Sequence, residues 1–405
     1  MPSDDLVLPE RVVMLHIGPH KTGTTTIQGA LHNSRKAMKE QGARYAGRYK
    51  QAYWAARSVV GSDVAPGRRP PTPKVWDKLV AEVNEAAEGR VVVSSEAFAG
   101  ADEETAARVV KDLSKSRPVH VVVTLRPLSK IVPSQWQQFT QNSLRKDYDT
   151  WLREVFNDAD DRSQTATFWR RHDHGALVAR WAKVVGPENV TVLVIDDTDR
   201  EFLTKTFERL LDLKAGSLVA PKEVANRSLT LAEIELIRRV NLQIGNEKWA
   251  KQAYSKVMKD GVADSMQINR RPDPDEVTIT TPRWAVERAS AVAAESAKTI
   301  SGLGVRILGD IDRITDHPSE AAIREGDAPE PTTIPLDAAI LAVIGAIHGM
   351  EMASTYRYKR DVEPEDRPIR DVPSKELLKI VAARTKNRGA DKAAPAKPKK
   401  ASGKS

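Results

Sequence analysis

One segment near the N-terminus contains the residue types that bind phosphate groups. Gly18 and Gly23 enclose a proline, a histidine, a lysine and a threonine, and three more threonines follow directly. A glycine-bearing turn between a strand and a helix points backbone N–H groups at an anion, and Lys21 adds a full positive charge. The three threonines can cap the helix and offer hydroxyl donors to the same oxygens. The sequence therefore predicts a phosphate-binding loop at residues 18–26.

The position of the lysine indicates which phosphate chemistry this loop serves. In a Walker A loop, GxxxxGK[ST], the lysine directly follows the second glycine and holds phosphates beside Mg²⁺. Here Thr24 follows Gly23, and Lys21 comes two residues before that glycine. The order Lys-Thr-Gly-Thr-Thr instead resembles the 5′-phosphosulfate loop of the sulfotransferases that use 3′-phosphoadenosine 5′-phosphosulfate (PAPS). In that family the loop lysine approaches the bridging oxygen and the sulfonate of the donor.

A second pair of phosphate ligands is predicted after a later strand. Arg126 directly follows the apolar run 119–125, and Ser134 comes eight residues after it. Arginine offers phosphate oxygens a planar fork of donors, which a serine hydroxyl can complete. In the PAPS sulfotransferases, an arginine at a strand end and a serine eight residues later bind the donor's 3′-phosphate. Taken alone, the pair is equally typical of a strand-end arginine and a helix-capping serine.

A third segment, Asn226-Arg227-Ser228, precedes an amphipathic helix and is similar to segments found late in bacterial sulfotransferase-like proteins. Arg227 and Ser228 are therefore candidates for contacts with the donor, although Ser228 is also a good N-cap for that helix. The cytosolic animal members of the family have an Arg-Lys-Gly segment here, which this chain lacks.

The resemblance implies PAPS as the sulfonate donor, no requirement for a metal ion and a catalytic role for Lys21. It extends over about residues 10–310 at the level of the fold, while its specific motifs are short. The donor-binding residues that it implies are His20, Lys21, Thr22, Gly23, Thr24, Thr25, Thr26, Arg126, Ser134, Arg227 and Ser228.

Sulfuryl transfer to a hydroxyl needs a base, and Glu96 is the first candidate. It follows the β-branched run 90–95, so it lies at the carboxyl end of a predicted strand. In the family, glycan-modifying members use a glutamate base and small-molecule members a histidine. We expect a partly dry cleft to raise the pKa of Glu96 towards neutrality. His20 is the competing candidate, His16 on the first strand is expected to be a packing residue, and a helix-start carboxylate is the structural alternative for Glu96.

Two other clusters leave alternative functions open. Asp196 and Asp197 end an apolar run as in a Walker B strand, which would suit an ATP-dependent kinase or NTPase. His172-Asp173-His174 has the residue types of a metal site but lacks a further ligand. A nucleotide-binding protein without a base is the third alternative.

Strand-like and helical segments alternate, which predicts an α/β fold of the P-loop type: a three-layer sandwich with a central parallel sheet flanked by helices. The expected strands are 12–17, 90–95, 119–125 and 189–195, with an edge strand at 305–310. The expected helices include 24–42, 74–88, 103–116, 129–142, 200–213, 284–300 and 336–357. Residues 43–73 and 247–275 are expected to be loops, the second within a candidate insertion at 246–283 over the acceptor site.

Composition and charge divide the chain into four segments. We divide it into a sulfotransferase-like domain at 1–317, a linker at 318–335, a helical appendage at 336–383 and a disordered basic tail at 384–405. The tail has eight Lys or Arg against one Asp, so it accounts for nearly all of the net charge of +8. Such a tail can contact an anionic membrane weakly or serve only solubility.

Cellular context and partners follow from the same features. The chain has no cysteine and begins with an acidic segment that lacks the features of a secretory signal, which suits the cytoplasm, with peripheral membrane contact through the tail. No specific nucleic acid partner is expected, because the charge belongs to the tail. The expected acceptor is a hydroxyl group of a carbohydrate or glycolipid, since aromatic residues at 45–54 suit sugar rings.

Overall fold

The structure, a computed structural model, describes residues 6–61, 72–86, 89–157, 164–221, 227–245 and 251–361. Its centre is a six-stranded parallel sheet with the strand order β2-β3-β1-β4-β5-β7. The predicted tail at 384–405 lies outside the described residues. The strands are β1 (Val13–His16), β2 (Ala43–Tyr45), β3 (Arg90–Ser94), β4 (Val119–Leu125), β5 (Val190–Val194) and β7 (Arg306–Leu308).

Helices cover both faces of this sheet, and alternate residues of β1 face them. Val13 and Leu15 lie in the core under one helical layer, whereas Met14 lies in the core under the other. The first layer has α3 (Tyr53–Val60), α4 (Pro73–Asn84), α5 (Glu103–Leu113), α9 (His174–Val185) and the end of α14 (Arg283–Gly302). The second has α1 (Thr24–Asn33), α2 (Arg35–Glu40) and α10 (Phe202–Leu210). The predicted α/β sandwich with a central parallel sheet is confirmed.

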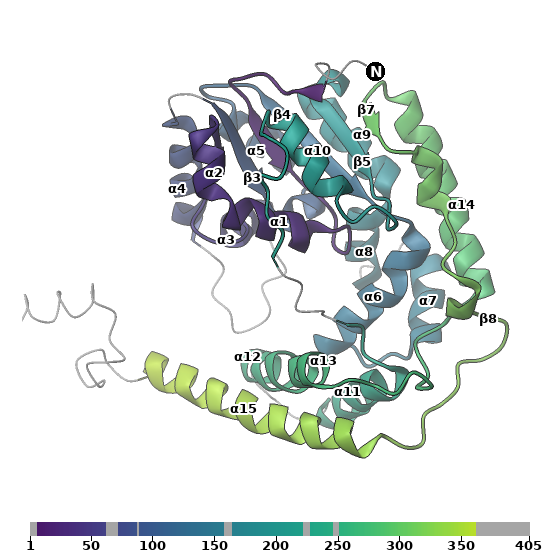
Figure 1. Ribbon diagram of the computed structural model, residues 1–405. Coiled ribbons are helices and arrows are strands. Elements are labelled where there is room, and N and C mark those ends of the chain that lie inside the picture. Colours follow the sequence, from purple (N-terminus) through teal and green to yellow (C-terminus); the bar gives the residue numbers. More distant parts are fainter. Residues whose placement is uncertain are drawn as a thin grey trace, which may run out of the picture.

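A separate hydrophobic core lies beside the sheet and is built mainly from helices; we call this part the helical lobe. Figure 1 shows α11, α12, α13 and α15 below the sheet, with α6 and α7 leading into them. Helix α14 joins the two parts, because Ala285 and Ala289 pack in this core while Ala293 and Ala297 pack under the sheet. The lobe contains α6 (Leu128–Gln141), α7 (Tyr148–Asn157), α8 (Gln164–His172), α11 (Leu231–Ile244), α12 (Lys251–Tyr254), the π-helix η4 (Ser255–Ala263), α13 (Asp264–Asn269) and α15 (Leu336–Asp361).

Two segments expected to be loops contain regular structure. The stretch 43–73 holds edge strand β2 and helix α3, because Tyr45 and the alanines of α3 are buried against the sheet. The stretch 247–275 holds α12, η4 and α13, whose apolar residues fill the helical lobe. Within 318–335, β8 (Ile323–Arg324) pairs with β6 (Thr281–Pro282). The predicted helix at 24–42 is two helices, since the chain turns at Ser34, whose hydroxyl accepts from Val219 N at 2.9 Å. The remaining short helices are η2 (Glu96–Gly100), η3 (Pro187–Asn189), η5 (Ile311–Thr315) and η6 (Glu320–Ala322).

Candidate active site

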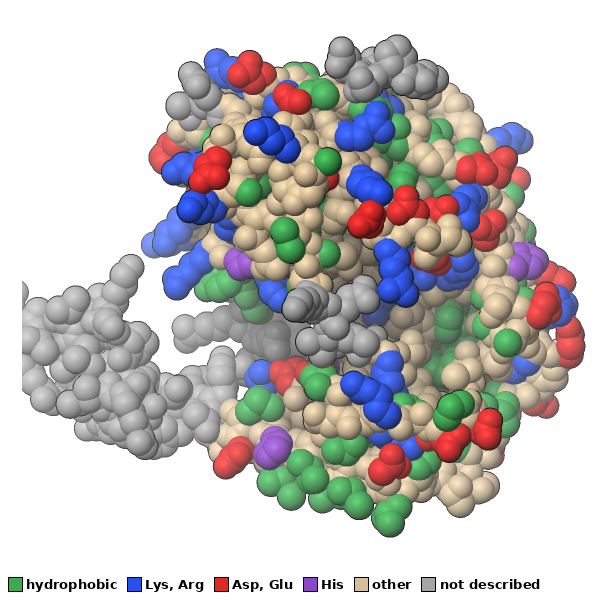
Figure 2. Space-filling model, in the orientation of Figure 1, with side chains coloured by type: hydrophobic (Ala, Val, Ile, Leu, Met, Phe, Trp, Pro, Cys, Tyr) green, Lys and Arg blue, Asp and Glu red, His purple; other side chains and the backbone are tan. Residues whose placement is uncertain are grey.

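The predicted phosphate-binding loop follows β1, the strand at which the order of strand addition reverses. Strand β1 sits between β3 and β4, so the chain crosses over it and leaves a crevice at the carboxyl ends of the strands. The loop follows β1, Glu96 follows β3 and Arg126 follows β4, which brings the three predicted segments to one edge of the sheet. In Figure 2 a hollow separates the α/β part from the helical lobe, and Lys and Arg side chains border it.

The loop can adopt its path only with glycine at both ends. A Cβ on Gly18 would lie 2.2 Å from Thr124 Oγ1, and one on Gly23 would lie 2.6 Å from Leu203 Cδ1. Gly23 and Lys21 both have positive φ, at 70° and 69°, and for a lysine this backbone is strained. Within the described ranges, the N–H groups of Lys21 and Gly23 make no hydrogen bond to another residue. These donors are therefore available to an anion.

Lys21 is a partly buried cation that no ion pair within the described ranges engages. Burial lowers the pKa of its ammonium group; the carboxylate of Glu96 opposes that shift and the charge of Lys259 adds to it. Lys259 belongs to η4, so the helical lobe contributes positive charge to the loop. Sequence reasoning missed Lys259, because its nearness to Lys21 depends on how the helical lobe packs against the sheet.

The loop threonines have different environments. Thr22 is buried; its hydroxyl donates to Pro19 O at 2.7 Å and shares a hydrogen bond with Thr124 Oγ1 at 2.9 Å. Its side chain therefore holds the loop onto the sheet. The expectation that a threonine caps α1 is wrong, since Gly23 is the N-cap and no side chain caps this helix. The hydroxyls of Thr25 and Thr26, in the first turn, make no hydrogen bond to a described residue.

Glu96, His20 and Thr24 form one hydrogen-bonded group. Glu96 Oε2 lies 2.8 Å from His20 Nδ1, and Thr24 Oγ1 donates to Glu96 Oε1. Burial alone would raise the pKa of Glu96, but the hydrogen bonds from His20 and Thr24 and the charge of Lys21 outweigh it and hold that pKa below its ordinary value. The expected raised pKa is therefore wrong, because two donors and a cation face this carboxylate.

This pairing determines the tautomer of His20. An ionised carboxylate only accepts hydrogen bonds, so the proton of a neutral His20 sits on Nδ1 and Nε2 is left as an acceptor. No described residue hydrogen-bonds to Nε2. The arrangement is that of an imidazole oriented by a carboxylate, with its second nitrogen free to accept a proton.

Buried histidines lie behind this group. Helix α8 packs against η2, and the pKa of its last residue, His172, is held well below the ordinary value by burial, with the charges of His174, His20 and Arg171 adding to the shift. Asp173, between the two histidines, caps α9 by accepting from Ala176 N at 2.9 Å. Across the described residues, no group of three or more His, Cys, Asp or Glu side chains is placed to hold a metal ion. His16 is a buried packing residue as expected, hydrogen-bonded to Ser94.

Arg126 projects from the end of β4 beside a second cation. Arg126 Nη2 and Lys130 Nζ donate to Asp197 Oδ2 at 3.0 Å and 3.1 Å, which lowers the pKa of Asp197 despite its burial. Arg126 Nε is buried and has no partner among the described residues. Ser134 lies on α6 and makes no hydrogen bond to a described side chain. Lys130 was missed, although it follows Arg126 by four residues and lies in the first turn of α6.

Both aspartates of the Walker B alternative are paired with cationic side chains of this chain. Asp197 accepts from Arg126 and Lys130, and Asp196 pairs with Arg313 and accepts from Thr198 N at 2.9 Å. The hydrogen bonds from Thr198 and the contact with Arg313 lower the pKa of Asp196 to about 2. This arrangement does not favour the kinase alternative.

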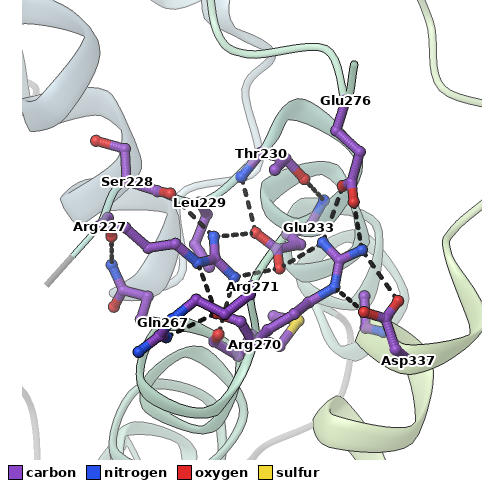
Figure 3. Close-up of polar contacts among 12 residues, drawn as sticks. Arg227, Ser228, Leu229, Thr230, Glu233, Gln267, Arg270, Arg271, Glu276 and Asp337 are labelled. Atoms are coloured by element: carbon purple, nitrogen blue, oxygen red, sulfur yellow. Dashed lines mark hydrogen bonds and ion pairs between the residues drawn. The ribbon is translucent and has the colours of Figure 1, made fainter. Parts of the chain in front are cut away.

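Arg227 and Ser228 lie in the helical lobe, and Figure 3 shows the contacts of Arg227. Its guanidinium donates to both oxygens of the fully buried Glu233, at 2.6 Å and 2.7 Å, and to Met266 O at 2.8 Å. Ser228 is exposed and does not cap α11, because Thr230 is the N-cap of that helix and Glu233 completes the capping box. A contact between Arg227 or Ser228 and a donor stays a prediction.

Comparison with known proteins adds one distant likeness. No model of a known protein family matches the chain, and no curated protein matches it. Among solved structures, the chain is similar to a sulfotransferase from Alicyclobacillus acidocaldarius, with a TM-score of 0.41 and 13% sequence identity. The likeness covers 75% of this chain and 98% of that chain. The fold described above rests on the sheet and helices of this chain, not on that likeness.

Proposed function

We propose that this protein is a sulfotransferase that moves a sulfonate group from PAPS to a hydroxyl group of an acceptor. One observation carries the proposal: a loop with unpaired N–H groups and a free lysine stands beside a histidine–glutamate pair at the carboxyl end of the central strand. An anionic donor and a proton acceptor are the two things that sulfuryl transfer requires. The acceptor proposed is a carbohydrate or glycolipid hydroxyl, because Tyr49 and Trp54 expose aromatic surface in the 45–54 segment that follows β2.

The described residues fit the two ends of this donor. The loop N–H groups, Lys21 and the first-turn threonines of α1 would hold the 5′-phosphate. Arg126, whose buried Nε has no partner among the described residues, and Lys130 would hold the 3′-phosphate. Bound PAPS would supply the sulfonate.

The roles of the chain's own groups follow from their positions. Lys21 and the loop N–H groups offset the negative charge that grows on the leaving phosphate as its bond to sulfur breaks. His20 Nε2 takes the proton of the acceptor hydroxyl as that oxygen bonds to sulfur. Glu96 orients the imidazole through Nδ1 and stabilises the imidazolium that forms. Glu96, whose pKa is lowered, is a weak proton acceptor near neutral pH.

Calorimetric titration tests the donor. Wild-type protein should bind 3′-phosphoadenosine 5′-phosphate tightly without a metal ion. We expect Lys21→Ala and Arg126→Ala each to weaken this binding about tenfold or more, because each removes a charge-assisted contact. Lys36→Ala, on an exposed part of α2, is the matched control. A preference for Mg-ATP that is indifferent to Arg126 would contradict the proposal and support a kinase.

A pair of variants tests which group is the base. His20→Asn keeps an N–H donor near the position of Nδ1 but removes the acceptor nitrogen. We expect it to lower kcat about a hundredfold or more while leaving binding of the bisphosphate intact. Glu96→Gln should have a smaller effect on kcat, since it removes orientation and charge. The reverse order, with Glu96→Gln the more damaging change, would make Glu96 the base.

A further inference from the structure

The outer face of α15 is apolar and exposed along about four turns. Figure 1 shows α15 along the lower edge of the molecule, and Figure 2 shows hydrophobic side chains gathered on that edge. No Asp, Glu, Lys or Arg occurs from residue 338 to residue 350. We call the exposed residues the α15 stripe, and each of them is between 41% and 75% exposed: Leu336, Ile340, Val343, Ile344, Ile347 and Met350.

The opposite face of α15 packs against the rest of the helical lobe. Ala338 and Ala342 are buried in the core of the helical lobe. Gly345 and Gly349 let α15 approach η4 so closely that a Cβ on either would lie within 2.6 Å of η4 backbone atoms. Residues 336–354 are long and apolar enough to span a membrane, but the helix would have to leave the lobe to do so. Its packing suits a helix that lies on a surface rather than across a bilayer.

The charges that follow the stripe point to the chemistry of that surface. Residues 351–383 are neutral in sum, with seven Lys or Arg against seven Asp or Glu, and residues 384–405 then add eight Lys or Arg against one Asp. An apolar helix face combined with a basic segment on the same chain is the combination that binds anionic membranes, because burial of the face and attraction to lipid headgroups act together. We propose that α15 docks this protein onto an anionic membrane surface through the α15 stripe, with the basic C-terminal segment adding electrostatic attraction.

A second copy of the chain is the alternative occupant, and the stripe fits it less well. Leu336, Ile340, Val343, Ile347 and Met350 do have the alternating spacing of a coiled-coil seam. Between the two ends of the stripe, however, the positions that flank the seam are Asp337, Ala339, Ile344 and Ala346, and Asp337 already pairs with Arg270 of the same chain. Coiled-coil partners are selected by charges at such positions, and the only charge at these four positions is already paired within the chain. The apolar face is wide and without charge, as a lipid surface requires.

Vesicle co-sedimentation of the full-length protein tests this docking. We expect binding to vesicles made of equal parts phosphatidylcholine and phosphatidylserine, weaker binding to pure phosphatidylcholine, and release from the mixed vesicles at high salt. The double variant Ile340→Ser/Ile347→Ser should bind about tenfold more weakly, because two apolar side chains no longer enter the lipid. Its thermal unfolding midpoint should match that of the wild type, since both residues are exposed.

Two further variants separate the contributions. Val219→Ser/Val277→Ser is the matched control, because these valines are 62% and 53% exposed but lie outside α15, and it should bind as the wild type does. Replacing Lys397, Lys399, Lys400 and Lys404 by glutamine should weaken binding to the mixed vesicles by about tenfold or more. The tests do not depend on sulfuryl transfer.

Two results would overturn the proposal. Equal vesicle binding by wild type and Ile340→Ser/Ile347→Ser would leave the basic tail as the whole cause of attachment. Absence of vesicle binding, together with a dimer in analytical ultracentrifugation that Ile340→Ser/Ile347→Ser dissociates, would make the stripe an interface between two copies of this chain.

Discussion

Four histidines are buried in the α/β part of the protein or beside the candidate active site, and burial lowers the pKa of each imidazole. His16 and His120 donate or accept hydrogen bonds with Ser94 and Thr191, whereas His174 Nε2 has no partner in the described part of the chain. Burial lowers the pKa values of His16, His120 and His174 to about 4. These imidazoles therefore stay neutral in the folded protein at pH values where an exposed histidine takes up a proton.

Acid should destabilise the protein through these residues. As the pH falls below 6.5, the unfolded chain binds protons that the folded chain does not take up until about pH 4, so the free energy of unfolding decreases over that interval. We expect His174→Leu to reduce this loss by an amount on the order of 2–3 kcal/mol. Urea unfolding measured at intervals between these two pH values checks the slope. An unchanged slope in the variant would mean that His174 is not held neutral.

Close backbone packing characterises the contact between α15 and η4. A Cβ on Gly345 would lie 2.4 Å from Gly261 O, and one on Gly349 would lie 2.6 Å from Lys256 O. Because these neighbours are backbone atoms, the helices would have to move apart to admit a side chain. The π-helical conformation of η4 and the small residues of α15 thus belong to one interface.

Gly345→Ala should decrease the free energy of unfolding by about 1–3 kcal/mol, because the added methyl group overpacks this interface. Gly302→Ala is the control: Gly302 is the last residue of α14, and a Cβ there meets nothing within 4 Å. We expect that change to be neutral or slightly stabilising. Chemical denaturation of both variants gives the comparison, and equal values would show that α15 does not approach η4 this closely.

Ion pairs connect distant parts of the chain across the helical lobe. Arg270, which is only 3% exposed, pairs with Glu233 of α11, with Glu276 and with Asp337 at the start of α15 (Figure 3). Glu233 also accepts from Arg227. Helix α14 adds a second connection, because its two ends pack in the two cores. Arg270 thus links three separate segments of the helical lobe, the part of the protein that contributes Lys259 to the candidate active site.

Arg270→Met should decrease the free energy of unfolding by about 3–5 kcal/mol, because it leaves buried Glu233 with one cation fewer and frees Asp337. Lys36→Met, which removes a pair between side chains that are 92% and 65% exposed, should change it by less than about 1 kcal/mol. Unfolding followed by tryptophan fluorescence measures both. Similar small effects of the two changes would show that the Arg270 pairs do not stabilise the lobe.

The sequence alone determined the features that depend on neighbouring residues. The β-branched runs at 90–95, 119–125 and 189–195 form strands because such residues suit a buried parallel sheet. The glycines and the lysine at 18–23 indicated an anion-binding turn, because glycine fits the close approach of the backbone at Gly18 and the positive φ at Gly23. The alternation of strands and helices also placed Glu96 and Arg126 at the carboxyl ends of two predicted strands.

The tertiary structure alone decided the features that depend on residues far apart in the chain. Tyr45, the alanines of α3 and the helices of 251–269 are ordered by burial against other elements, which local periodicity does not reveal. The pKa of Glu96 is lowered, not raised, because folding brings His20, Thr24 and Lys21 to its carboxylate. The charge of Lys259 acts on Lys21, and Arg227 pairs with Glu233, for the same reason. Electrostatic interactions depend on distance in space, and the sequence records only distance along the chain.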